Sequence, residues 1–382
     1  GNISFCHIGG FVGDYSVSDN SSFIISDSTN YGPVTSDAEL NNAGGFVGSL
    51  TSCAHTLFLR NTNHGNTTCL KNNCNVGGLV GSFDSETYSH AEFINSTADG
   101  PVSGFGPYDV VGGFIGSVSQ FGLGNATTDF IGCAANGPVS CSAGYCDVGG
   151  FIGMINVMLE DDIKVTMRNT VNNANVLCDG SNCNAGGFVG KASLGYSLTM
   201  AIQSCTNNGN VMASKASSHS GGFVSYFYRL YTTSVLHATF ESSTNNGNIS
   251  AASSGSVASG FFNTNFETTY NVSSAVFNSV NNGFVNGTSS FGIATSVSRA
   301  HNVVNTRLVD GSTSAKLLWQ YSNSTSFVYT LNDMQRDKNG IYHTDDGSRL
   351  DDTLNNEVKA EGYEMAWTST LSLAQTVYDV TL

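Results

Sequence analysis

Six of the ten cysteines are spaced so that they could form disulfides or bind a metal ion. They lie in three pairs with four residues between the partners, and the second cysteine of each pair stands three residues before a Gly-Gly pair. The simplest interpretation is three local disulfides, each closing a loop. Zinc held by four thiolates from two pairs on neighbouring turns is the alternative, disfavoured because the first pair has no adjacent pair. The predicted disulfides are Cys69–Cys74, Cys141–Cys146 and Cys178–Cys183.

Acidic residues and histidines do not form a catalytic pattern. Glycoside hydrolysis needs two carboxylates a few ångströms apart, and no column of acids recurs along the chain. The runs Glu160–Asp162 and Asp345–Asp352 are interpreted as exposed loops, with weak calcium binding as the alternative. The eight histidines share no metal-type spacing, and no histidine column lies beside a Ser or Cys column. We therefore predict no catalytic residue, no cofactor and no metal site.

Composition narrows the class of protein. A net charge of −15 with only 14 Lys and Arg argues against nucleic-acid binding, which needs clustered cations. The chain holds no run of about 18 apolar residues, so we predict no membrane span. Hydrophobic residues make up 40% of the chain, enough to bury a core.

Cysteine usage and glycosylation motifs together predict a secreted or cell-surface protein. Ten cysteines are unusual in the cytosol and ordinary outside the cell. Nine Asn-x-Ser/Thr sequences could carry N-linked glycans. These features favour a eukaryotic glycoprotein, with an exported bacterial protein as the alternative. The candidate glycosylation residues are Asn2, Asn20, Asn66, Asn95, Asn125, Asn248, Asn271, Asn286 and Asn323.

The positions of these residues are set by a repeat of about 35 residues. The block Gly9–Gly13, of sequence GGFVG, recurs from Gly44, Gly77, Gly112, Gly149 and Gly186, with weaker copies further on. A second block, clearest as Ser204–Val211, precedes each copy from the second onward and contains an Asn-Gly turn signal.

Alignment of the repeats gives three apolar columns, with Phe130, Val139 and Phe151 as members. Their segments are short and bounded by Gly and Asn, as is typical of strands. Three strands per repeat predict an all-β, right-handed parallel β-solenoid of about nine coils. Helical repeats would need long stretches poor in Gly and Asn, and β-propellers use a longer period.

Four further cysteines have no partner that the sequence identifies. Cys133 and Cys205 share a column two coils apart, about 9.6 Å by strand spacing, which is too far for a disulfide. Cys6 shares a column with Cys74, but Gly1 occupies its partner position. Cys53 is the fourth.

The block Gly78-Leu79-Val80-Gly81, together with the Asn-Asn-Gly-x-Val block upstream, resembles the GLUG-type repeat of surface and adhesin-like proteins. The resemblance covers roughly residues 1–300. It implies an extracellular β-solenoid on a microbial or protist surface, and it implies no catalytic residues.

Composition changes near residue 313. Residues 316–382 hold 15 of the 43 charged residues and both tryptophans. We expect a β-solenoid over residues 1–312 and a C-terminal capping or assembly module over 313–382.

The first repeat bears on function, because Gly9-Gly10-Phe11 lacks the upstream strand block. An uncapped solenoid end exposes strand edges that template further stacking. We predict a structural protein, not an enzyme, that self-associates through its ends in a surface filament or coat. Coverage by an upstream stretch of the same polypeptide is the alternative for this edge. An adhesin that binds glycan or a host surface is the alternative function, and a polysaccharide-active enzyme is less favoured.

Overall fold

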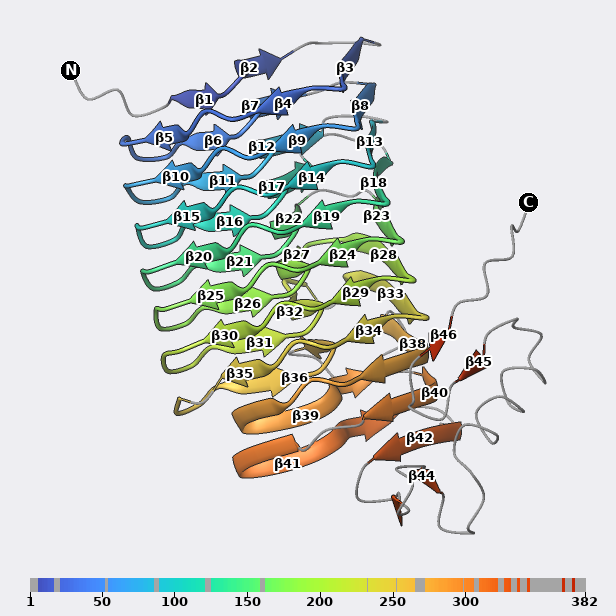
Figure 1. The fold of residues 1–382 in the computed structure, drawn as a ribbon. Coiled ribbons are helices and arrows are strands. Elements are labelled where there is room, and N and C mark those ends of the chain that lie inside the picture. Colours follow the sequence, from blue (N-terminus) through green and yellow to red (C-terminus); the bar gives the residue numbers. More distant parts are fainter. Residues whose placement is uncertain are drawn as a thin grey trace.

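The computed structural model describes residues 6–16, 21–51, 54–85, 89–120, 125–158, 162–231, 233–251, 253–264, 272–297, 299–305, 309–321 and 326–330, with pairs at 335–336, 342–343, 366–367 and 373–374. These residues form strands and loops, without a helix. The strands stack in parallel, coil upon coil (Figure 1). The prediction of an all-β parallel β-solenoid is therefore confirmed.

Two large sheets form the walls of the solenoid. The first sheet has three strand columns per coil, and each strand pairs in register with its equivalent one coil away. The column before the Gly-Gly bend is β1 His7–Gly9, β6 Asn42–Gly44, β11 Asn75–Gly77, β16 Val110–Gly112, β21 Asp147–Gly149, β26 Asn184–Gly186, β31 His219–Gly221 and β36 Val257–Ser259. The column after the bend is β2 Val12–Ser16, β7 Val47–Thr51, β12 Val80–Ser85, β17 Ile115–Gln120, β22 Ile152–Val157, β27 Val189–Leu194, β32 Val224–Arg229 and β37 Phe262–Thr264. The third column is β5 Val34–Ser36, β10 Thr67–Cys69, β15 Val102–Gly104, β20 Val139–Cys141, β25 Val176–Cys178, β30 Val211–Ala213 and β35 Ile249–Ala251.

The second sheet has two strand columns per coil. Its longer strands are β3 Ser22–Ser26, β8 His55–Leu59, β13 His90–Ile94, β18 Ala126–Ile131, β23 Asp162–Arg168, β28 Ser197–Gln203 and β33 Val235–Glu241. Its two-residue strands are β4 Thr29–Asn30, β9 Thr62–Asn63, β14 Thr97–Ala98, β19 Ala134–Ala135, β24 Val171–Asn172, β29 Thr206–Asn207 and β34 Thr244–Asn245. The three predicted strand regions are thus present, but the structure divides one at the Gly-Gly bend and adds a two-residue strand.

In the later coils, single strands run through positions that separate strands occupy in the earlier coils. The merged strands are β38 Val272–Asn281, β39 Val285–Val297, β40 Arg299–Asn305, β41 Val309–Tyr321 and β42 Ser326–Thr330. Seven coils, β1 to β35, keep five separate strands each, so the predicted count of about nine is slightly too high for regular coils. The ladder continues through β41, which crosses residue 312, and through β42, which lies after it. Two small antiparallel pairs follow, β43 Gln335–Arg336 with β44 Tyr342–His343 and β45 Ala366–Trp367 with β46 Leu373–Ala374.

The residue at the Gly-Gly bend changes along the first sheet, whereas the first merged strand, β38, joins the β33 and β34 columns of the second sheet. A Cβ on Gly44 would lie 1.9 Å from the Val47 carbonyl oxygen, so a side chain does not fit the bend of that coil. Ser259 occupies the equivalent position in β36, and β36 and β37 stay separate there. In β39 the equivalent position is Phe291, which pairs in register with Ser259 of β36. At Phe291 the two flanking segments run on as one strand, whereas they stay separate at Ser259.

Aromatic stacks fill the space between the two sheets. Phe130 stacks on Phe93 with ring centroids 4.9 Å apart, and Phe114 stacks on Phe151 at 4.7 Å. The two stacks meet edge to face, with Phe114 and Phe130 centroids 6.1 Å apart. These rings are fully buried, and each contributes roughly 2–3 kcal/mol by its transfer from water. The strand registers confirm the predicted columns, since Phe130 pairs with Phe93 and Met167.

Candidate functional site

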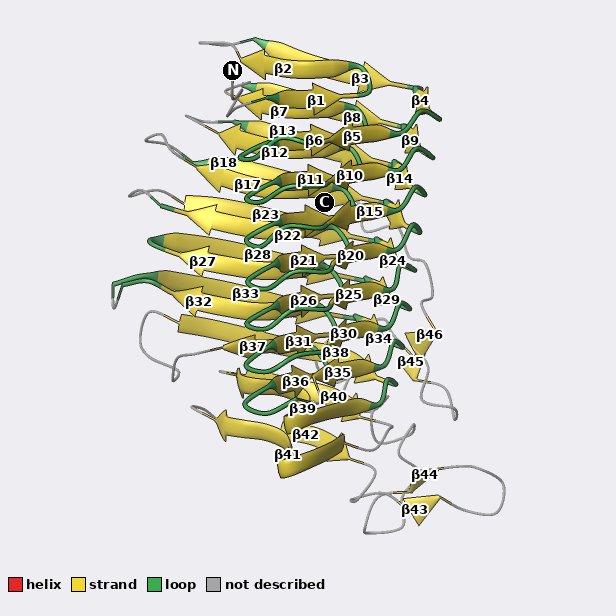
Figure 2. Cartoon of the chain, turned by 90° about the vertical axis from the view of Figure 1, so that its left-hand side faces the viewer, coloured by secondary structure: helices red, strands yellow, loops and turns green. Residues whose placement is uncertain are grey.

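The loops that connect each third-column strand to the next strand of the first sheet carry the cysteine pairs. The structure joins each predicted pair in a disulfide, with Cα–Cα distances of 6.4, 6.4 and 6.1 Å. All six sulfurs belong to buried residues beside a small second core of valines and alanines. Figure 2 shows these loops one above another along the solenoid. Each disulfide therefore closes one loop within one coil.

Coils without a cysteine pair close the same loop with polar groups. In the first of them the Asn41 amide donates a hydrogen bond to the Ser36 hydroxyl, and Ser36 pairs in register with Cys69. In another, the Asp109 carboxylate accepts from the Gly106 N–H and the Cys74 N–H, each at 2.9 Å. Burial raises the pKa of Asp109 to about 7, although these backbone hydrogen bonds oppose the shift. The same loop conformation is therefore stabilised by a disulfide in some coils and by hydrogen bonds in others.

The other cysteines occupy structural positions where they are described. The Cys133 thiol is buried and donates to the Phe93 carbonyl oxygen at 3.1 Å. Burial raises the pKa of Cys133 to about 11 and that of Cys205 to about 12, so neither thiol is ionised near neutral pH. Both are free, in keeping with their predicted separation, and Cys6 is free and partly exposed. Cys53 lies outside the described residues.

The predicted glycosylation residues lie at the surface wherever the structure describes them. Asn2, Asn20, Asn271 and Asn323 lie outside the described residues, as do Glu160, Asp161 and the run Asp345–Asp352. Asp162 is exposed at the start of β23. The exposed candidates are Asn66, Asn95, Asn125 and Asn248, and Asn286 is partly exposed.

Asparagines form two parallel ladders at the Asn-Gly turns. One ladder is buried, and each side-chain amide donates to the next coil's amide oxygen, as in Asn207 to Asn245 at 2.7 Å. The other ladder is exposed, as in Asn246 to Asn208 at 2.8 Å. The turns were predicted from the sequence, but the buried ladder was not. The buried ladder contains Asn30 and Asn63 and, after a gap of two coils, Asn172, Asn207, Asn245, Asn281 and Asn305.

A polar cluster lies on the first sheet where three coils meet. The Asn184 amide donates to Asp147 at 2.7 Å, and Lys191 Nζ lies 4.0 Å from the same carboxylate. The His219 ring stacks on Tyr226 at 4.0 Å. Burial raises the pKa of Asp147, lowers that of His219 to about 4 and raises that of Tyr226 to about 12. One carboxylate takes part in these contacts, so the cluster lacks the acid pair that glycoside hydrolysis requires.

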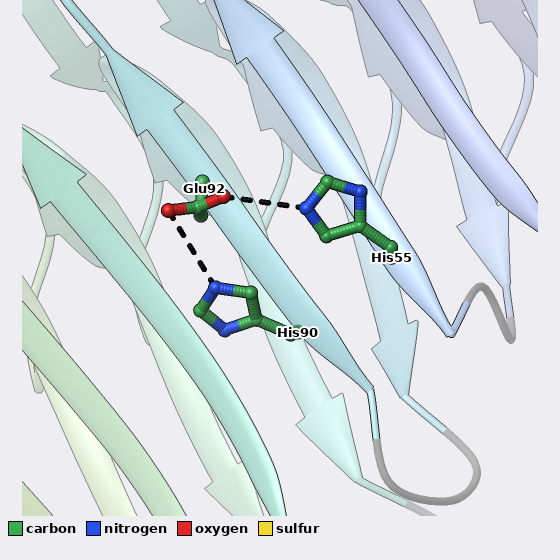
Figure 3. Close-up of side chains that lie close together, drawn as sticks. All are labelled: His55, His90 and Glu92. Atoms are coloured by element: carbon green, nitrogen blue, oxygen red, sulfur yellow. Dashed lines mark hydrogen bonds and ion pairs between the residues drawn. The ribbon is translucent and has the colours of Figure 1, made fainter.

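A second titratable cluster lies on the second sheet, on β8 and β13. The Glu92 carboxylate lies 3.3 Å from His55 Nε2 and 3.6 Å from His90 Nε2 (Figure 3). The side chains are 38%, 40% and 27% exposed for His55, His90 and Glu92. Ligand atoms of the three residues all lie within 4.8 Å of one another.

The sequence interpretation missed this cluster, because it searched for metal-type spacing along the chain. The ligands come from neighbouring coils, since His55 pairs in register with His90. A signal was present: His55 and His90 each stand three residues before a member of one apolar column, Phe58 and Phe93. Alignment of the outward-facing positions would have placed the two histidines side by side.

Fold and side chains together define a disulfide-stabilised parallel β-solenoid. Comparison with protein-family models, curated proteins and solved structures finds no match to this chain. The resemblance to GLUG-type repeats therefore stays a prediction. No helix among the described residues is long and apolar enough to cross a membrane.

Proposed function

We propose that this chain is an extracellular structural β-solenoid, with repeats of the GLUG type and no enzymatic activity, that assembles end to end in a surface filament or coat. Phe11 carries the proposal. Its side chain is 51% exposed, whereas Phe46, its equivalent in the second coil, is fully buried. Phe11 stacks on Phe46 at 4.7 Å and so continues the interior aromatic column into the first described coil.

The strand edge around Phe11 supports the same proposal. Among the described residues, β1 pairs with β6, β2 with β7 and β3 with β8, each on one side. Such an edge presents backbone donors and acceptors to an added strand. A second copy of the solenoid would continue the parallel ladder and bury the exposed ring.

An oxidising compartment is supported by independent features. Three disulfides close loops of the solenoid, and disulfides persist mainly outside the cytosol. Four predicted N-glycosylation residues are exposed in the structure. Glycans at these turns would project from the side of the solenoid and leave its end free.

Association of the purified, oxidised chain tests the proposal. We expect rods in negative-stain images and masses above one chain in light scattering. Phe11→Glu places a charge at the open end and should abolish the rods. Ile24→Glu is the matched control, because Ile24 is an exposed apolar residue of the same coil on the second sheet. A monomeric native chain, or rods that survive Phe11→Glu, would contradict end-to-end assembly.

An adhesin that binds glycan is the second candidate. Tyr108 and Tyr145 occupy equivalent turns, and their rings stack with centroids 5.0 Å apart. Both are exposed, as is nearby Phe105. Exposed aromatic faces are suited to packing against sugar rings, since they combine apolar area with a polar tip. Tyr31 is an exposed tyrosine elsewhere on the solenoid and serves as the control. Loss of glycan-array binding in a Tyr108→Ala/Tyr145→Ala variant, with retention in Tyr31→Ala, would support this candidate.

A further inference from the structure

We propose that His55, His90 and Glu92 form a binding site for a divalent transition metal of the zinc class. The site is independent of the assembly proposed above. His90 and Glu92 are two residues apart on β13, so their side chains project from the same face of the sheet. His55 lies directly beside His90 on β8, one coil away. Three ligands thus converge from two coils (Figure 3).

The distances suit a tetrahedral metal. Bonds of about 2.0–2.2 Å from zinc to nitrogen and oxygen place neighbouring ligand atoms about 3.4 Å apart. The structure places Glu92 Oε2 3.3 Å from His55 Nε2, and Glu92 Oε1 3.6 Å from His90 Nε2. A metal between these atoms needs small ring rotations, which the partly exposed side chains permit.

The surroundings of His90 orient its ring. His90 Nδ1 contacts the Thr127 hydroxyl and lies 3.9 Å from the Asp129 carboxylate, both on β18 of the next coil. A proton on Nδ1 directed at these oxygens leaves Nε2 free to bind the metal, as outer-shell partners do in known sites. The arrangement therefore spans three coils, with ligands from two and orienting groups from the third.

The donor set selects the metal class. Two imidazoles and one carboxylate suit zinc, copper or nickel, whereas calcium and magnesium prefer oxygen ligands throughout. Three protein ligands leave a fourth position for water. Bound metal would join the second and third coils on the second sheet, whereas the disulfides close loops at the edge of the first sheet.

Metal titration of the untagged, oxidised chain tests the site. We expect one tightly bound Zn²⁺ per chain by calorimetry and by metal analysis after dialysis. Zn²⁺ should also raise the melting temperature. His55→Ala and Glu92→Gln should each abolish that binding, and Thr127→Ala should weaken it by about 10- to 100-fold.

His237→Ala is the matched control. His237 is an exposed histidine in the strand column of His55, and its in-register neighbours are Thr199 and Ser273. The control should bind Zn²⁺ as tightly as the native chain. Retained binding in a His55→Ala/His90→Ala variant, or absence of binding in the native chain, would overturn the proposal.

Cobalt distinguishes this site from adventitious binding to a thiol. Co²⁺ in a site of two imidazoles and one carboxylate should give visible bands without a thiolate charge-transfer band. A thiolate band would assign the metal to a cysteine and overturn the proposal. These readouts do not depend on rod formation, so failure of the site would leave the assembly proposal standing.

Discussion

Replacement of Asn207 by alanine would test the buried asparagine ladder. The Asn207 side-chain amide is fully buried, and it donates to the Gly209 carbonyl at 3.0 Å and to Asn245 Oδ1 at 2.7 Å. Its oxygen accepts from Asn172 Nδ2 at 2.7 Å. Alanine would leave three buried groups without these partners. At about 1 kcal/mol per group, near the lower end of the usual range, we expect a loss of about 3 kcal/mol in the free energy of unfolding.

Asn208 provides the control, because it has the same side chain in the adjacent, exposed ladder. It donates to Asn173 at 2.9 Å and accepts from Asn246 at 2.8 Å. Water can replace these partners, so Asn208→Ala should cost less than about 1 kcal/mol. Urea unfolding followed by circular dichroism gives both values, and hydrogen exchange across residues 205–213 shows whether the loss is local. Equal losses in the two variants would refute the argument from burial.

Three further predictions concern the core, the loops and pH. Phe130→Ala should destabilise the solenoid by about 3–5 kcal/mol, because it removes a fully buried ring that stacks on Phe93 and meets Phe114 edge to face; an unchanged urea midpoint would mean that the columns are misaligned. Peptide mapping without reduction should recover the three disulfides within single coils, and a Cys146–Cys183 bridge would contradict the structure. Because burial raises the pKa of Asp109 to about 7, the folded chain holds this proton more tightly than the unfolded chain, and stability should fall by up to about 4 kcal/mol as pH rises from about 4 to 7. Asp109→Asn should flatten that dependence in urea unfolding, and an unchanged slope would assign it to another group.

The repeat allowed the interior of the fold to be predicted residue by residue. Each coil must place an apolar side chain against the same neighbours, so Phe130, Val139 and Phe151 recur at fixed offsets in the sequence. The register of the strands follows directly, as Val139 pairs with Val102 and Val176. The Gly-Gly bend was harder to foresee, since its effect on strand number depends on backbone contacts closer than a Cβ would allow.

The residues at buried polar positions were less predictable, because different side chains can meet the hydrogen-bonding needs of the same position. The buried asparagine ladder is interrupted by Ala98 and Ala135, which are adjacent in the stack. Two neighbouring alanines remove the side-chain donor and the side-chain acceptor of one hydrogen bond together. This lowers the free energy of unfolding far less than removing one partner and leaving the other buried without a hydrogen bond. Because this position holds asparagine in some coils and alanine in others, the ladder cannot be recognised from residue type along the sequence. The Asn-Gly turns beside it can be recognised.

The outer faces of the sheets follow a different constraint from the interior. The size of an interior side chain is restricted by its neighbours in the coils before and after it. A side chain on an outer face mainly contacts solvent, so its size and type are less restricted. His55 and His90 stand in such a column, and the same column carries Thr127 one coil further on. Substitutions there leave the fold intact, so one pair of coils can acquire a ligand set that the rest of the solenoid lacks. Site-specific chemistry in this protein is therefore expected where the repeat varies on its outer faces, and its interior columns serve only to hold those side chains in register.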